Sequence, residues 1–77
     1  MRFFFHLRDV DTYEEDLEGI ELPSLAQAIV EARRSAREMV AELVLNDDVV
    51  DGRAFEIAGG DGSTLATVAF KDVVRME

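Results

Sequence analysis

The sequence is poor in the residues that usually build covalent or metal-bound sites. Its 77 residues include no cysteine, no tryptophan, one histidine and one proline. Without cysteine the chain cannot form a disulfide framework, a thiolate zinc site, an iron–sulfur cluster or a cysteine nucleophile. No apolar run approaches the ~20 residues of a membrane-spanning helix, and the run after Met1 is too short for a secretory signal. We therefore expect a soluble, cytoplasmic protein.

Basic residues are also scarce. The chain has 8 Lys and Arg against 17 Asp and Glu, which gives a net charge of −9. The net charge is −5 over residues 1–22, 0 over residues 23–46 and −4 over residues 47–77. Nucleic acids and anionic membranes are bound through Lys and Arg, so we expect neither as a partner. A chain of this length is expected to form one domain, residues 1–77, whose core is seldom large enough to enclose a substrate pocket.

The neutral middle of the chain has the pattern of an amphipathic helix. Ser24 and Gln27 form a capping box, which marks a helix start. Apolar residues recur at steps of three and four from Leu25 to Leu43, and Asn46 is expected to end a helix of about 22 residues. The apolar stripe includes three small residues, Ala28, Ala32 and Ala36. They would let the helix lie close to the surface that it covers.

The segment Arg2–Arg8 is predicted to be a strand, because aromatic side chains favour a pleated, half-buried surface. Alternation places Phe3, Phe5 and Leu7 on one face of it, and Phe4 and His6 on the other. Phenylalanine on both faces indicates a central strand or a second buried surface.

Three more strands are predicted, over residues 19–22, 53–58 and 64–70. The acidic stretch 9–18 is expected to be a loop or a wide hairpin, and the glycines of 59–62 a tight turn. The tail 71–77 fits either a helical turn or a strand extension. The whole reads as a ββαββ domain of the α+β class, with one long helix packed on a small antiparallel sheet.

No constellation of catalytic or ligand-binding residues emerges. His6 would need one of three serines and an orienting carboxylate, and no serine lies in a nucleophile-elbow context. The acids of the 9–18 stretch lack the spacing of a calcium loop. The 59–62 glycines lack the lysine of a phosphate-binding loop. We therefore expect no catalytic residue, metal site or cofactor.

Residues with no clear place in the core suggest an interaction surface instead. Its candidate members are Phe4 and His6 on the second face of the first strand, and Val30, Arg34 and Leu45 on the outward face of the helix. An apolar surface of this kind fits a protein partner or a homodimer. The three arginines of the helix, at 33, 34 and 37, are expected to pair with acids of the same chain, such as those of the 9–18 stretch.

Several segments resemble a family of small bacterial proteins described only as a domain of unknown function. They are MRFFFHLRD at the start, GIELP before the helix, EARRSARE within it and LATVAFKDVV near the end. This resemblance implies no activity. A more generic pattern, a strand, an acidic turn with glycine, a short strand ending near Pro23 and an alanine-rich helix, is similar to HicB-like antitoxins.

Three functions are consistent with these features. The first is a non-enzymatic protein-interaction module that acts as a homodimer or as a subunit of a complex. The second is a HicB-like antitoxin, or an inhibitor that mimics nucleic acid and occupies a basic partner. The third is a metal-dependent enzyme that uses paired carboxylates, for which the chain offers no groups to position them.

Overall fold

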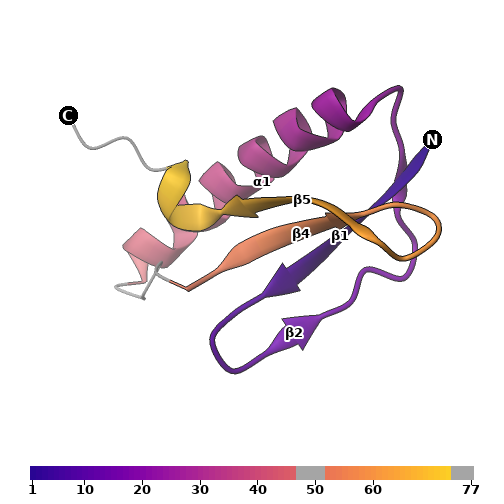
Figure 1. The fold of residues 1–77 in the computed structure, drawn as a ribbon. Coiled ribbons are helices and arrows are strands. Elements are labelled where there is room, and N and C mark those ends of the chain that lie inside the picture. Colours follow the sequence, from indigo (N-terminus) through magenta and orange to yellow (C-terminus); the bar gives the residue numbers. More distant parts are fainter. Residues whose placement is uncertain (47–51, 74–77) are drawn as a thin grey trace.

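The chain forms one long helix against an antiparallel sheet. The computed structural model describes residues 1–46 and 52–73. Along the chain these residues form β1 (Arg2–Arg8), β2 (Tyr13–Glu14), β3 (Ile20–Glu21), α1 (Leu25–Leu45), β4 (Ala54–Ala58), β5 (Thr64–Ala69) and the 3₁₀ turn η1 (Phe70–Asp72). The α+β class and the helix on an antiparallel sheet are confirmed (Figure 1).

The strand β1 lies inside the sheet. The strand order is β2-β1-β4-β5, and β3 pairs with the same edge of β1 as β2 does. Of the two alternatives predicted for β1, the central position is confirmed. The acidic stretch 9–18 adopts the wide hairpin of the two predicted alternatives, since β2 within it pairs back onto β1. The observed order therefore has one short strand more than the predicted ββαββ.

The helix α1 begins and ends where the sequence predicts. The Oγ of Ser24 accepts a 3.2 Å hydrogen bond from the backbone N–H of Gln27, and the N–H of Asn46 donates to the carbonyl of Glu42 at 3.0 Å. Its buried residues are Ala28, Ala32, Ala36, Val40 and Leu43. Because three of the five are alanines, the helix backbone can approach the sheet closely.

The core is completed by residues that follow β5. Phe3, Ile57 and Phe70 are fully buried, and the rings of Phe55 and Phe70 lie 5.4 Å apart at 47°. The predicted strand 64–70 ends one residue early, because Phe70 enters η1 and turns toward the helix. Of the two alternatives for the tail, the helical turn is correct as far as Asp72; residues 74–77 lie outside the described residues.

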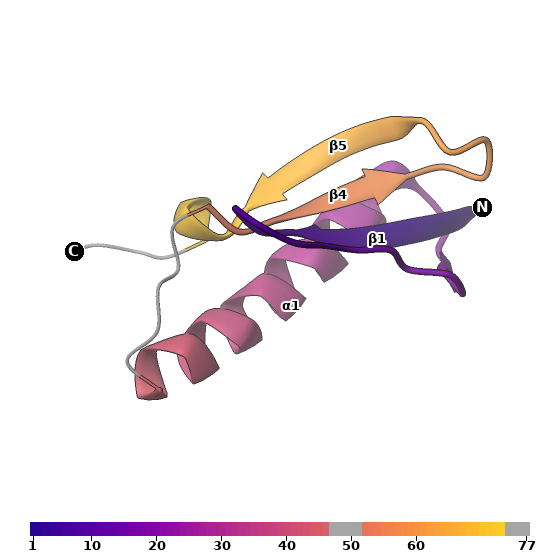
Figure 2. The same ribbon diagram turned by 90° about the horizontal axis from the view of Figure 1, so that it is seen from below.

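One face of the sheet is covered by α1 and the other is left open, as the view from below shows (Figure 2). We call these the inner and the outer face. Of the inner side chains of β1, Phe3 is fully buried, whereas Phe5 and Leu7 are only partly buried. No helix in the described part of the chain is long and apolar enough to cross a bilayer.

Candidate interaction surface

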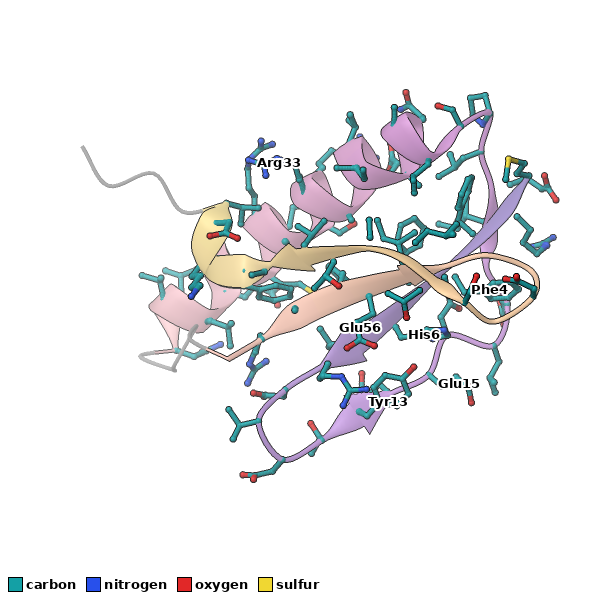
Figure 3. The ribbon with its side chains drawn as sticks, in the orientation of Figure 1. Phe4, His6, Tyr13, Glu15, Arg33 and Glu56 are labelled. Atoms are coloured by element: carbon teal, nitrogen blue, oxygen red, sulfur yellow. The ribbon has the colours of Figure 1, made fainter. Side chains whose placement is uncertain are left out.

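A row of aromatic and charged side chains crosses the outer face of the sheet. Phe4 and His6 come from β1, and their rings are 6.4 Å apart and inclined by only 12°. The ring of Tyr13, from β2, follows at 5.7 Å from His6. The guanidinium of Arg8 lies 4.5 Å above the centre of the Tyr13 ring and pairs with the carboxylate of Glu56, from β4. We call these five residues the outer row (Figure 3).

The charged end of the outer row is held by its own ion pair. Glu56 accepts a hydrogen bond from Nε of Arg8, which raises the pKa of the guanidinium above its ordinary value. The cation–π contact with Tyr13 holds the same group from the other side. Arg8 is therefore a fixed cation at one end of the row, and Phe4 and His6 form its aromatic end.

Asp16 forms hydrogen bonds with His6 and with the backbone of β1 beside the outer row. Its backbone N–H donates a 3.0 Å hydrogen bond to Nδ1 of His6, and its carboxylate accepts from the backbone N–H of Phe5 at 3.1 Å. The same carboxylate accepts from the N–H groups of Glu18 and Gly19, both at 3.2 Å. Since Nδ1 of His6 is an acceptor, the proton of the neutral ring is on Nε2. The imidazole is thereby fixed in one tautomer.

The carboxylate of Asp16 is stabilised in its charged form. Partial burial is the largest single influence and would raise its pKa, but the hydrogen bonds from the N–H groups of Phe5, Gly19 and Glu18 act in the opposite direction and favour the charged form. The pKa of Asp16 is consequently lowered. A fixed, ionised carboxylate is thus present beside the aromatic end of the outer row.

An open groove lies next to the row, between the acidic segment and the glycine turn. Its volume is about 260 Å³. It is lined by Phe4, His6, Glu15, Asp16, Leu17 and the glycines at 59, 60 and 62. Leu17 is 81% exposed, Gly60 and Gly62 are exposed, and Gly59 is buried. We call this the outer groove; its lining combines aromatic residues, acidic residues and one exposed apolar residue.

A second hollow opens on the inner face, alongside α1. It has a volume of about 190 Å³ and is lined mainly by Phe5, Ile20, Ala32, Ser35 and Phe55, with Asp16 and Glu31 also in contact. It exists because the single helix does not cover the whole inner face of β1. The described residues contain no group of three or more His, Asp or Glu that could hold a metal ion.

The five residues predicted as an interaction surface lie on two faces. Phe4 and His6 belong to the outer row, whereas Val30, Arg34 and Leu45 lie on the outward side of α1, across the sheet from them. Val30 and Leu45 are 55% and 84% exposed. The structure therefore brings together the first two and separates them from the other three.

Of the helix arginines, Arg34 pairs with an acid of the same chain as expected, but that acid is on the helix and not in the 9–18 stretch. Arg34 forms a 2.7 Å ion pair with Glu31, one turn away on the same helix. Within residues 1–46 and 52–73, Arg33 and Arg37 have no ion pair. For Arg33 the reason is geometric: it lies beside η1, which follows β5, whereas β2 is at the opposite edge of the sheet (Figure 3).

Sequence reasoning missed Tyr13, Arg8 and Glu56 as members of the row. Alternation along β1 places Arg8 on the same face as Phe4 and His6, so its membership could have been predicted from the sequence. What could not be read is the register, in which Arg8 pairs with Tyr13 and His6 with Glu56. Register brings these residues together from three segments of the chain.

Comparison with known proteins gives one match. A family model described as a domain of unknown function (DUF6894) matches residues 2–71. No curated protein and no solved structure matches the chain significantly. The resemblance to such a family is confirmed, and the similarity to HicB-like antitoxins stays a prediction.

Proposed function

The chain belongs to the family described as a domain of unknown function (DUF6894), and we propose that it is a non-enzymatic protein-interaction module whose outer face binds a basic, extended segment of a protein partner. It would act as a homodimer or as a subunit of a complex. The carrying observation is the outer groove, which is lined by the aromatic residues Phe4 and His6 and by the acidic residues Glu15 and Asp16.

The chemistry of the outer groove fits arginine or lysine side chains. The face of an aromatic ring attracts a cation, and a carboxylate within reach adds a charged hydrogen-bond acceptor. Leu17 offers an apolar contact for the stem of such a side chain. The contact of Arg8 with Tyr13 is an internal example of the same arrangement on the same face.

The charge of the whole chain supports a basic partner. At −9 it attracts positively charged proteins over distances near the Debye length and accelerates their encounter. Seven of the 17 acids fall within residues 1–22, the part of the chain that contains β1, β2 and the segment beside the outer groove. Attraction at long range and contact at short range thus involve the same part of the chain.

The antitoxin alternative uses the same property, since an acidic inhibitor also occupies a basic site. The two hypotheses use the same surface of this chain, and they differ in the partner, which for an antitoxin would be a toxin or a nuclease. For that reason an experiment on the surface comes first, and the identity of the partner follows from it.

A defined probe tests the surface. We would titrate the ¹⁵N-labelled chain with an eight-residue peptide of alternating arginine and leucine, and follow backbone amide shifts by NMR. We expect the largest shifts around the outer groove. Glu15→Gln should weaken binding about threefold, as one partly screened charge pair would. Leu17→Ala should weaken it about tenfold through lost apolar contact.

Matched variants on the opposite face serve as controls. Val30→Ala and Leu45→Ala remove exposed apolar groups of α1 and should leave the affinity unchanged. A peptide of alternating glutamate and leucine should not bind. If the helix variants weaken binding more than the groove variants do, or if the acidic peptide binds equally well, the proposal is wrong.

A further inference from the structure

The two edges of the sheet differ in how far their backbone groups are already paired. On the β1 side, the edge is occupied in three pieces: β3 pairs with Arg2 and Phe3, Asp16 accepts from the N–H of Phe5, and β2 pairs with Leu7 and Arg8. The pieces β2 and β3 are two residues long and each contains a glutamate, at 14 and 21. Short, charged, interrupted strands prevent further strand pairing.

The edge formed by β5 is longer and uncharged, and its one irregularity is near its amino end, where Ile57 pairs with Ala66 but Ala58 pairs with Thr64. Its sequence, TLATVA, contains no charge and no proline, and it is six residues long. The N–H of Phe70 donates to the carbonyl of Arg53, so the hydrogen-bonded pairs of the β4–β5 ladder fall on alternate residues that include Val68. The backbone groups of Thr67 and Ala69 therefore point away from β4. No element in the described part of the chain pairs with that edge.

We propose that β5 pairs in antiparallel fashion with β5 of a second copy, so that the two sheets join into one. This inference makes the self-association in the proposed function specific. A two-fold axis at Thr67 would align Thr67 with its own counterpart, so that the outward backbone groups of Thr67 in the two copies bond to each other. Ala69 would then lie opposite Leu65 of the other copy, next to the irregularity in the ladder. Because Thr67 pairs with Glu56 across the ladder, this alignment makes a threonine–threonine pair on the outer face.

Charges of opposite sign predominate near the two ends of β5, where Lys71 and Arg33 outnumber Asp72 at the carboxyl end and Asp61 is at the amino end. Lys71, the single lysine of the sequence, follows the carboxyl end of β5, and Asp61 precedes the amino end. Arg33 lies beside η1 at the same end as Lys71 (Figure 3), where α1 and η1 are in contact. Neither Lys71 nor Arg33 has an ion pair within residues 1–46 and 52–73. Antiparallel pairing brings these cations of each copy toward Asp61 of the other.

The carboxylate of Asp61 is held in place and in its charged form by Ser63. The carboxylate accepts hydrogen bonds from the hydroxyl and the N–H of Ser63, at 2.7 and 3.0 Å, and these bonds lower its pKa. The charge is therefore fixed in the turn that leads into β5. Any other partner would need a cation of its own opposite Asp61. In a symmetric dimer, Lys71 of each copy supplies that cation to Asp61 of the other copy.

The mass of the full chain in solution tests the inference. Sedimentation equilibrium at micromolar to hundreds of micromolar concentration should approach twice 8.6 kDa. Thr67→Pro blocks the edge without removing a bond to β4, because the N–H of Thr67 points outward. It should give a folded monomer by circular dichroism. Lys71→Glu should raise the dissociation constant about fivefold.

Because the chain has no cysteine, a single introduced thiol gives a second and independent readout. Under mild oxidation Thr67→Cys should form a disulfide-linked dimer, since the axis places the residue against its own copy. Ala41→Cys, on the exposed side of α1, should remain monomeric. A chain that stays monomeric at the highest concentration overturns the inference, as does a dimer that Thr67→Pro leaves intact. Neither result changes the binding of the basic peptide, so failure here is distinguishable from failure of the outer groove.

Discussion

The carboxylate of Asp16 takes the place of a strand for the backbone of Phe5. It accepts the N–H of Phe5 at 3.1 Å, at the point on β1 that lies between the residues paired with β3 and those paired with β2. A peptide N–H at this position would otherwise have no partner on that edge, which costs about as much as a lost hydrogen bond. One side chain thus joins two short strands into a continuous covering of β1.

This role predicts that Asp16 is required for stability at neutral pH. Asp16→Asn keeps one acceptor oxygen but places an amide nitrogen where the carboxylate accepts from several N–H groups. We expect the free energy of unfolding to fall by about 1–2 kcal/mol, measured by urea denaturation at pH 7. Asp11→Asn, an exposed acid of the same stretch, is the control and should change stability by less than about 0.5 kcal/mol.

The same residue predicts a pH dependence of stability. The pKa of Asp16 is lower in the folded chain than in the unfolded one, so its contribution is complete above the unfolded value of about 3.9 and is lost as the pH falls through the folded value. The difference in unfolding free energy between the wild type and Asp16→Asn should therefore be largest near pH 7 and shrink in strongly acidic solution. A difference that stays constant with pH would contradict the assigned hydrogen bonds.

The tautomer of His6 can be observed directly. Because the N–H of Asp16 donates to Nδ1, ¹⁵N NMR of the neutral ring should show Nδ1 unprotonated and Nε2 protonated. Two variants separate the acceptor from the ring. His6→Asn offers an oxygen near the place of Nδ1 and should keep the amide of Asp16 protected from hydrogen exchange. His6→Phe keeps the stacking with Phe4 but leaves that amide unpaired, so its exchange should accelerate.

Gly19 is predicted to resist substitution. Its φ is +71°, and an added Cβ would lie 2.9 Å from the carbonyl oxygen of Phe3 and 2.9 Å from Cε2 of Phe4. Gly19→Ala should cost about 1–3 kcal/mol in unfolding free energy, because both the backbone conformation and the contact oppose a side chain. Gly60→Ala is the matched control: nothing lies within 4 Å of the new Cβ, and we expect little change. Equal effects of the two variants would show that the close approach at Gly19 is not needed.

Local patterns in the sequence were enough for the helix, and they were not enough for the candidate surface. The capping pair Ser24 and Gln27 and the steps of the apolar stripe act within a few residues, so they could be read one turn at a time. The alternation of Phe3 and Phe4 likewise assigned the two faces of β1. The division of the predicted surface depends on which face the helix covers, and that is decided by packing between distant segments.

Phe70 and Asp16 show where sequence reading fails for physical reasons. Phe70 continues an alternating strand pattern, but burial of its ring under α1 outweighs the extension of β5 by one residue. Asp16 is one of many acids in a polar stretch, and nothing distinguishes it until the register of β2 and β3 leaves the N–H of Phe5 unpaired. Both depend on contacts between residues far apart in the sequence, for which a single sequence carries no direct record.

The close packing of α1 on the sheet predicts a sharp contrast between two alanines of the helix. Ala36 is fully buried and faces the core, whereas Ala41 is exposed on the outward side. Ala36→Leu would force three extra carbon atoms into the space between helix and sheet and should lower the unfolding free energy by about 1–3 kcal/mol. Ala41→Leu adds the same atoms in solvent, with nearly the same helix propensity, and should change stability by less than about 0.5 kcal/mol. Urea denaturation of both variants measures the difference. If Ala36→Leu is as stable as Ala41→Leu, the helix lies farther from the sheet than the buried alanines indicate.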